Sequence, residues 1–221
     1  MKLDKLFKGL TRIANGNYVL EGDLICEEDL EIELDDCLVV RGKIEVKKNI
    51  KAGCCINAGE GINAGWGINA GGGINAGCGI NAGCGINAGC GINAGEGINA
   101  GCGINAGWGI NAGTHIYCEK RIFAGLSVYH TSENCDKTIR CAELQKGEIA
   151  FGELVIKPKM KPCPFCGNKK VDVLSAAEIE ENEDVAECYA VICSANDGGC
   201  GATGGYKENP EEAVENWNQR T

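Results

Sequence analysis

Isoleucine recurs at every sixth position along the central part of the chain, from Ile44 to Ile122. Between residues 61 and 113 the repeating unit is Gly-Ile-Asn-Ala-Gly-x. A short fixed period of this kind is the signature of a parallel β-solenoid, because stacked coils bury together what no single repeat can bury alone. The repeat therefore predicts an internal isoleucine column, with neighbouring strands about 4.8 Å apart.

The order of residues within the unit predicts where each side chain points. Ile and Ala lie two residues apart, so they share one face of a strand, and we place them inward. Asn lies between them and points outward, where we expect it to stack on the Asn of the next coil. The Gly-x-Gly segment turns the corner, and we expect its glycines to supply the positive φ of a tight turn. With three strands per coil, residues eighteen apart stack on one another.

The last position of the unit, x, accepts side chains as different as Glu, Trp, Gly and Cys. A position of this kind does not face a thin core, so we place it at an exposed corner. Tryptophan is enriched among the residues that dominate protein interfaces. The candidate partner-binding residues are therefore Trp66, Trp108, Glu60 and Glu96, unless the corner side chains have no function. The corner cysteines are interpreted as small fillers.

Two features precede the regular repeats. Apolar residues with helical spacing predict a short amphipathic helix within residues 1–17 that caps the open solenoid edge: Leu3, Leu6, Phe7 and Leu10. Imperfect hexads then begin near residue 18. Leu24 and Leu30 lie two residues out of the later register, which predicts a bulge or a corner insertion near Ile32.

Charge and cysteine content limit the class of protein. Residues 21–36 contain nine acids and no base, which predicts either a solvated flank or a patch for a basic partner. The formal net charge of −10 argues against binding to nucleic acid backbones. No apolar signal core or membrane-spanning run is found, so we expect a cytoplasmic chain whose 16 cysteines are reduced. His115 and His130 are isolated, and we assign them no chemistry.

A second domain follows the solenoid, which we expect to span residues 18–157. Residues 163–167 read Cys-Pro-Phe-Cys-Gly, a knuckle in which two thiolates fill two corners of a zinc tetrahedron. Cys193 and Cys200 are the expected second pair, although their spacing is wide and Cys188 competes. Four thiolates close the shell of the metal, so the predicted zinc is structural. Asn209 and Pro210 predict the start of a helix that packs onto a small ribbon.

The solenoid part resembles bactofilin-like β-helix sequences, through hexads such as Asn49-Ile50-Lys51-Ala52-Gly53. That resemblance implies a right-handed, three-sided helix and allows self-assembly. Residues 158–221 are similar to the Lar family of restriction alleviation proteins. The similarity rests on Lys161-Pro-Cys-Pro-Phe-Cys-Gly167, on Cys193 and Cys200-Gly-Ala202, and on Glu212-Ala-Val-Glu-Asn-Trp-Asn218. Members of that family are small prophage proteins that relieve host type I restriction.

The expected fold is thus mainly β, a three-sided parallel solenoid with an N-terminal helix, followed by a zinc ribbon with a C-terminal helix. The expected function is counter-defence by a phage or prophage protein that binds a host restriction enzyme or CRISPR effector in the bacterial cytoplasm. The alternative is a self-assembling structural protein. An acyltransferase is disfavoured because the histidines lack a supporting motif. We expect no membrane association and no direct sequence-specific nucleic acid binding; a homodimer is left open.

Overall fold

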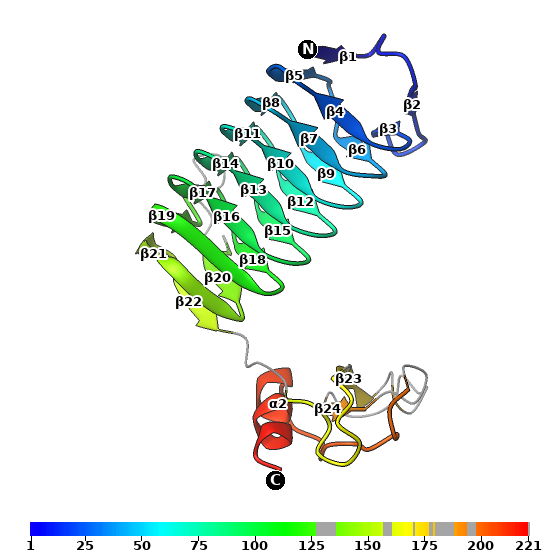
Figure 1. Cartoon of the computed structure of the whole chain (residues 1–221), viewed down its shortest axis with the longest axis vertical. Helices are drawn as coiled ribbons and strands as arrows, with labels where there is room; N and C mark the ends of the chain where they lie inside the picture. The colour runs from blue at the N-terminus through cyan, green and yellow to red at the C-terminus, as the bar shows by residue number, and fades with distance from the viewer. Residues whose placement is uncertain are drawn as a thin grey trace. The chain divides into compact units, whose positions relative to one another are not determined.

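The computed structural model describes residues 1–126, 136–156, 161–169, 171–176, 179, 188–193 and 198–220. The chain divides into two compact units, Met1–Ile156 and Lys157–Thr221. This division lies one residue from the boundary expected from the sequence. Residues 127–135, which include His130, and residues 157–160 fall outside the described residues. Figure 1 labels the strands of the first unit and the helix of the second.

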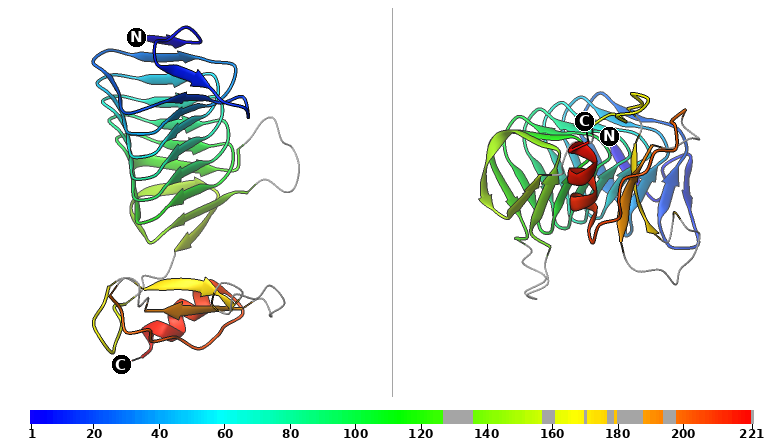
Figure 2. Two further views of the ribbon diagram at one scale, coloured as in Figure 1. Left: turned by 90° about the vertical axis from the view of Figure 1, so that its right-hand side faces the viewer. Right: turned by 90° about the horizontal axis from the view of Figure 1, so that it is seen from below.

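The first unit is a stack of short strands (Figures 1 and 2). Before the regular repeats the strands are β1 Lys2–Asp4, β2 Leu10–Arg12, β3 Tyr18–Leu20, β4 Leu24–Cys26, β5 Leu30–Glu33, β6 Leu38–Val40, β7 Ile44–Val46 and β8 Ile50–Ala52. The regular strands are β9 Ile56–Ala58, β10 Ile62–Ala64, β11 Ile68–Ala70, β12 Ile74–Ala76, β13 Ile80–Ala82, β14 Ile86–Ala88, β15 Ile92–Ala94, β16 Ile98–Ala100, β17 Ile104–Ala106 and β18 Ile110–Ala112. The last strands are β19 His115–Ala124, β20 Thr138–Cys141, β21 Glu143–Phe151 and β22 Glu153–Ile156.

Each strand from β9 to β16 pairs in parallel with the third strand before it and the third strand after it. Ile62 lies beside Ile80, and Ile68 lies beside Ile86, so that equivalent residues eighteen apart in the sequence are neighbours. The strands therefore form three columns, which run β4-β7-β10-β13-β16, β5-β8-β11-β14-β17 and β3-β6-β9-β12-β15-β18. The long strand β19 continues the first two columns and joins them into one sheet.

The inward assignment of Ile and Ala is confirmed. Each isoleucine of the repeat, from Ile44 to Ile122, is 0% exposed, and the repeat alanines are buried beside them. The outward stacking of Asn is also confirmed, because from Asn75 to Asn111 the Nδ2 of each repeat Asn donates to the Asn Oδ1 of the preceding coil at 2.7–3.0 Å. An apolar column inside and amide ladders outside thus hold the coils together in the same register.

The reason for the repeat glycines differs from the predicted one. None of the glycines between Gly42 and Gly113 has a positive φ, so that expectation was wrong. The glycine after each Ala instead lies against the backbone of the coil before. A Cβ at Gly65 would lie 1.9 Å from the carbonyl oxygen of Lys47, and one at Gly77 would lie 2.1 Å from that of Gly59. Close approach of neighbouring coils, rather than turn geometry, excludes a side chain there.

The predicted N-terminal capping helix in residues 1–17 was wrong, because this segment forms the strands β1 and β2. β1 pairs in parallel with β5, and β2 pairs antiparallel with β3. Leu3 is fully buried opposite Ile32, whereas Leu6 is 92% exposed, so the apolar residues do not share one helical face. Strands satisfy the unpaired backbone groups at the solenoid edge, which a helix lying across that edge leaves open. The segment covers the edge, as expected, by strand pairing.

The expected corner insertion is confirmed. In the first coils, paired residues are twenty apart, as with Leu24 and Ile44, whereas Leu38 and Ile56 are eighteen apart. The two extra residues lie in the corner between the end of β5 and the start of β6. Leu34 in this corner is buried, so the insertion adds an apolar contact to the core.

The described residues of the second unit form an antiparallel ribbon and the helix α2, Pro210–Asn218. The ribbon strands are β23 Asp172–Ser175 and β24 Tyr189–Ile192. Asn209 caps the helix, because its side chain accepts the N–H of Glu212 at 2.8 Å, as its position before Pro210 predicted. Ala213 and Trp217 pack against the ribbon and are buried. No helix among the described residues is long and apolar enough to cross a membrane.

Candidate metal centre

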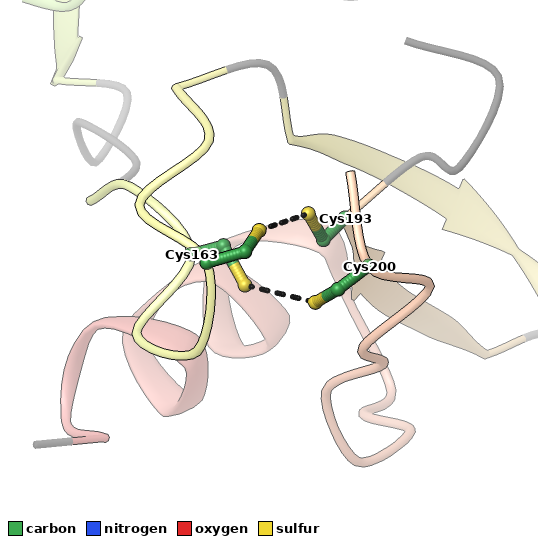
Figure 3. A group of neighbouring side chains, drawn as sticks. Cys163, Cys193 and Cys200 are labelled. Atoms are coloured by element: carbon green, nitrogen blue, oxygen red, sulfur yellow. Dashed lines mark hydrogen bonds between the residues drawn. The ribbon is translucent and has the colours of Figure 1, made fainter. Parts of the chain in front are cut away.

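Four cysteine sulfurs converge at one end of the ribbon in the second unit. The ligand atoms of Cys163, Cys166, Cys193 and Cys200 all lie within 4.8 Å of one another. The sulfurs of Cys163 and Cys200 are 3.6 Å apart, and so are those of Cys166 and Cys193 (Figure 3). The structure thus brings together the four residues that the sequence nominated as metal ligands.

The first knuckle is shaped by three backbone hydrogen bonds. The N–H of Gly167 donates to the carbonyl of Cys163 at 2.8 Å, and the N–H of Cys163 donates to the carbonyl of Asn168 at 2.8 Å. Gly167 has a φ of +72°, which glycine adopts without the strain that a Cβ brings. The N–H of Asn168 then points at the sulfur of Cys166. The short spacing and the glycine together aim both sulfurs to the same side.

The second knuckle repeats this pattern despite its wider cysteine spacing. The N–H of Gly201 donates to the carbonyl of Cys193 at 2.9 Å, and the N–H of Cys193 donates to the carbonyl of Ala202 at 2.8 Å. Gly201 has a φ of +76°, and the N–H of Ala202 points at the sulfur of Cys200. The residues between Cys193 and Cys200 therefore do not alter the bonds that orient the two sulfurs.

Cys188, the competing ligand in the sequence, lies outside the cluster. It immediately precedes β24, is half-buried, and its carbonyl accepts the N–H of Ala176 at 2.7 Å. Among the residues that the structure describes, the four-cysteine cluster is the only group with metal-binding geometry. Cys188 precedes β24 and Cys193 follows it, so backbone pairing places Cys188 at the opposite end of the ribbon from the metal centre.

The spacing of the sulfurs fits a tetrahedral metal ion. A Zn–S bond of about 2.3 Å gives a tetrahedron edge of about 3.8 Å. The two sulfur pairs at 3.6 Å match that edge closely, and the remaining pairs lie below 4.8 Å. Four soft donors at this distance can hold a divalent ion with little movement of the chain.

The thiols of the cluster differ in their tendency to ionise. The backbone N–H of Asn168 stabilises the thiolate of Cys166 and lowers the pKa of that thiol to about 7. Burial raises the pKa of the Cys193 thiol to about 12, because a lone negative charge is disfavoured there. A bound cation would remove this penalty, since metal binding drives thiols to the thiolate form.

The core of the second unit supports the cluster from one side. Cys163 and Cys193 are buried in the same apolar cluster as Val191 and Trp217. The indole Nε1 of Trp217 donates to the carbonyl of Lys161 at 3.0 Å, and the N–H of Lys161 donates to the side chain of Asn218 at 2.7 Å. The helix thereby fixes the segment that leads into the first knuckle. The spacing of the cysteines does not predict these supporting bonds, although the recurrence of Cys-Gly at both knuckles hinted at their shared shape.

The candidate residues of the solenoid lie on its corners and are not brought together. Trp66 is 53% exposed and Trp108 is 41% exposed. Backbone hydrogen bonds between neighbouring coils place Trp66 in one corner row with Cys84, whereas Trp108 stacks on Cys90 in another row. Glu60 and Glu96 are exposed on the third row. The four residues therefore form no single site.

Five of the nine acids in segment 21–36 form ion pairs with basic side chains from neighbouring parts of the chain. The pairs are Glu21 with Arg41, Glu28 with Lys48, Glu31 with Lys51, Glu33 with Lys2, and Asp35 with Lys5 and Arg12. Such exposed pairs contribute little to stability, at most about 1 kcal/mol each. They do reduce the local negative field, which favours the solvated flank over an acidic docking patch.

Comparison with known proteins places the second unit in a class. Residues 158–221 match the family model of restriction alleviation protein Lar. The chain thus carries a Lar-type restriction alleviation domain, and the solenoid lies outside that match. No curated protein and no solved structure matches the chain.

Proposed function

We propose that this protein is a phage or prophage counter-defence protein that binds a host defence nuclease and inhibits it by protein–protein contact. The target is a restriction enzyme or a CRISPR effector in the bacterial cytoplasm. The observation that supports the proposal is the match of residues 158–221 to the Lar family, together with the four-cysteine cluster inside it. The proposed action requires neither a membrane nor sequence-specific contacts to nucleic acid.

The metal in this proposal is zinc, and its role is structural. Cys163, Cys166, Cys193 and Cys200 supply a complete tetrahedral ligand set, whereas a catalytic zinc site keeps one position open. When bound, zinc would supply a fixed link between the two knuckles. The second unit then provides a stable binding surface and no reaction of its own.

The solenoid offers a rigid surface for binding, and His115 is the one histidine among its described residues. Both ring nitrogens of His115 are engaged: Nδ1 lies 3.1 Å from the Thr114 hydroxyl and Nε2 lies 3.2 Å from the Asn99 side-chain oxygen. This arrangement makes His115 the end of an asparagine ladder rather than a base positioned for a substrate. A binding role for the first unit is therefore favoured over an acyltransferase role.

Capture from a host lysate tests the proposal directly. Tagged full chain is expressed in bacteria that carry a type I restriction system or a CRISPR system, and bound proteins are identified by mass spectrometry. We expect a nuclease subunit to be enriched with the wild type and with Cys188→Ser, and lost with Cys163→Ser. Equal recovery with all three chains, or no enrichment of either nuclease, would contradict the proposal.

A further inference from the structure

The two ends of the solenoid differ in how the apolar column is closed. At the N-terminal end, Leu3 of β1 is fully buried, and Phe7 and Leu10 pack against the same core. β1 and β2 also pair with the outer edges of β5 and β3. This end of the column is covered by the chain itself.

The other end of the column is open. Four apolar side chains of the last coil stack on buried residues of the coil before it: Leu144 on Ile116, Ile149 on Ile122, Leu154 on Ile139, and Ile156 on Cys141. We call these four side chains the open end. Leu154 is 38% exposed and Ile156 is 47% exposed, whereas the residues beneath them are 0% exposed.

The backbone at the open end is also unpaired on one side. Within the described residues, β21 pairs with β19 and β22 pairs with β20, and neither has a partner on its outer edge. A strand edge that combines free backbone groups with apolar side chains recruits another strand. A binding partner at the open end must therefore supply both strand edges and apolar side chains.

A second copy of the chain meets both requirements. β21 turns a corner at Gly147, where φ is +131°, so its two halves continue two adjacent columns and β22 continues the third. A two-fold axis through this corner and the middle of β22 stacks two open ends face to face. Each half of β21 then lies antiparallel to the other half of its copy, and β22 lies antiparallel to itself. We propose that the open end is a homodimer interface of this kind.

Side-chain chemistry agrees with this two-fold arrangement. Leu144 of one copy lies against Ile149 of the other, and the two Leu154 side chains lie near the axis. Lys146 and Glu148 flank the corner, so each faces the opposite charge across the axis. Within the chain they pair with Glu119 at 2.5 Å and Arg121 at 3.3 Å, which leaves no excess charge at the corner. Glu153 of each copy lies at opposite ends of the paired β22 strands, so like charges are kept apart.

The covered N-terminal end determines the size of the assembly. An isologous contact uses the same surface on both copies and closes after two. A filament requires a second free end, but at the N-terminal end β1 and β2 occupy the edges of β5 and β3. Of the strands β3, β4 and β5, only β4 keeps an outer edge without a partner strand among the described residues. The solenoid therefore forms a dimer and not a polymer, and this holds whether or not the proposed function is correct.

Sedimentation velocity of the full chain over a range of concentrations tests the proposal. We expect the wild type to sediment at twice the chain mass. The double variant Leu154→Glu/Ile156→Glu should sediment as a monomer, with the dissociation constant raised by about a hundredfold or more. Ile25→Glu is the matched control, because Ile25 is 55% exposed on β4 and lies away from the open end. This control should remain dimeric.

Amide hydrogen exchange of the wild type provides a second measurement that does not depend on folding of the variant. Protection of the amides of residues 153–156 should rise with protein concentration, while protection of β12 should not change. A monomeric wild type, whose open end is then covered by the second unit or left bare, would overturn the proposal. Filaments would overturn it too, as would a dimer that survives the double substitution, since the contact would then lie elsewhere.

Discussion

The two glycines of each repeat are required to different degrees. A Cβ at Gly77 would lie 2.1 Å from the backbone oxygen of Gly59, whereas a Cβ at Gly79 would lie 3.2 Å from that of Gly97. Alanine at the first position must push two coils apart, but at the second position it needs only a small adjustment. The pair therefore separates the effect of coil spacing from the general effect of adding a methyl group.

We predict that Gly77→Ala lowers the free energy of unfolding by about 1–3 kcal/mol or more, as overpacking does. Gly79→Ala should change it by less than about 1 kcal/mol. Chemical denaturation of the two variants, followed by circular dichroism, measures the difference. Equal destabilisation by both substitutions would show that close approach of the coils does not explain the glycines.

Ile80 tests the internal column at the same scale. Its side chain is 0% exposed, and no buried polar group lies in the core among the described residues. We predict that Ile80→Asp unfolds several coils, because burial of an unpaired carboxylate costs several kcal/mol, roughly the stability of a whole domain. Cys84→Asp, at an exposed corner, should leave the melting temperature nearly unchanged. A soluble Ile80→Asp protein with wild-type melting would contradict the inward assignment.

At the scale of elements, the two knuckles are equivalent parts whose four sulfurs a bound metal ion would join. Each knuckle is closed by its own backbone hydrogen bonds, and each contributes two sulfurs to the cluster. We predict that Cys163→Ser abolishes stoichiometric metal binding and unfolds the second unit, since structural zinc contributes about 10 kcal/mol in small domains. The solenoid should keep its circular dichroism signal and its melting transition.

Metal analysis of the purified full chain and two-stage thermal melting measure both effects. Cys188→Ser is the control, because Cys188 lies outside the cluster, and it should retain one metal ion per chain. A wild-type protein without metal would contradict the assignment of the centre. A Cys163→Ser protein with the wild-type metal content would contradict it as well.

The sequence predicted the structure correctly where it depends on residues close by in the chain. The prediction was wrong where contacts with residues far away in the sequence determine the structure. Ile80 and Asn81 could be placed because a period of six fixes the face of every strand. The N-terminal helix was wrong because the spacing of Leu3 and Leu6 says nothing about the free edge of β5, which lies about thirty residues away and recruits β1. The role of Gly77 was missed for the same reason, since Gly59 approaches it from another coil.

The metal centre shows the same division between local and distant information. Cys163 and Cys166 could be paired from their spacing, and Cys193 and Cys200 were expected as the second pair. Spacing alone could not decide between Cys188 and Cys200, because the choice depends on how β24 aligns with β23. The hydrogen bond from Trp217 to Lys161 likewise could not be predicted from the sequence, since it joins the two ends of the second unit.

At the scale of the whole molecule, the corner tryptophans are the best test of solenoid contacts. Trp66 and Trp108 are both exposed but lie on different corner rows, so one compact contact includes only one of them. We predict that either Trp66→Ala or Trp108→Ala lowers affinity for the captured nuclease by about 2 kcal/mol, roughly thirtyfold. The other variant should bind like the wild type, and both should keep the fold. If the double variant also binds with full affinity, the solenoid contacts its partner elsewhere.

We propose that the Lar-type domain relieves host restriction and needs its four-cysteine centre to do so. The most direct measurement is the plating efficiency of unmodified phage on bacteria that carry a type I restriction system and express the full chain. We predict that the wild type and Cys188→Ser restore plating towards the level of a restriction-deficient host, whereas Cys163→Ser, expressed at a comparable level, does not. Plating that stays as low with the wild type as with an empty vector, in this system and in a CRISPR-proficient host, would contradict the claim.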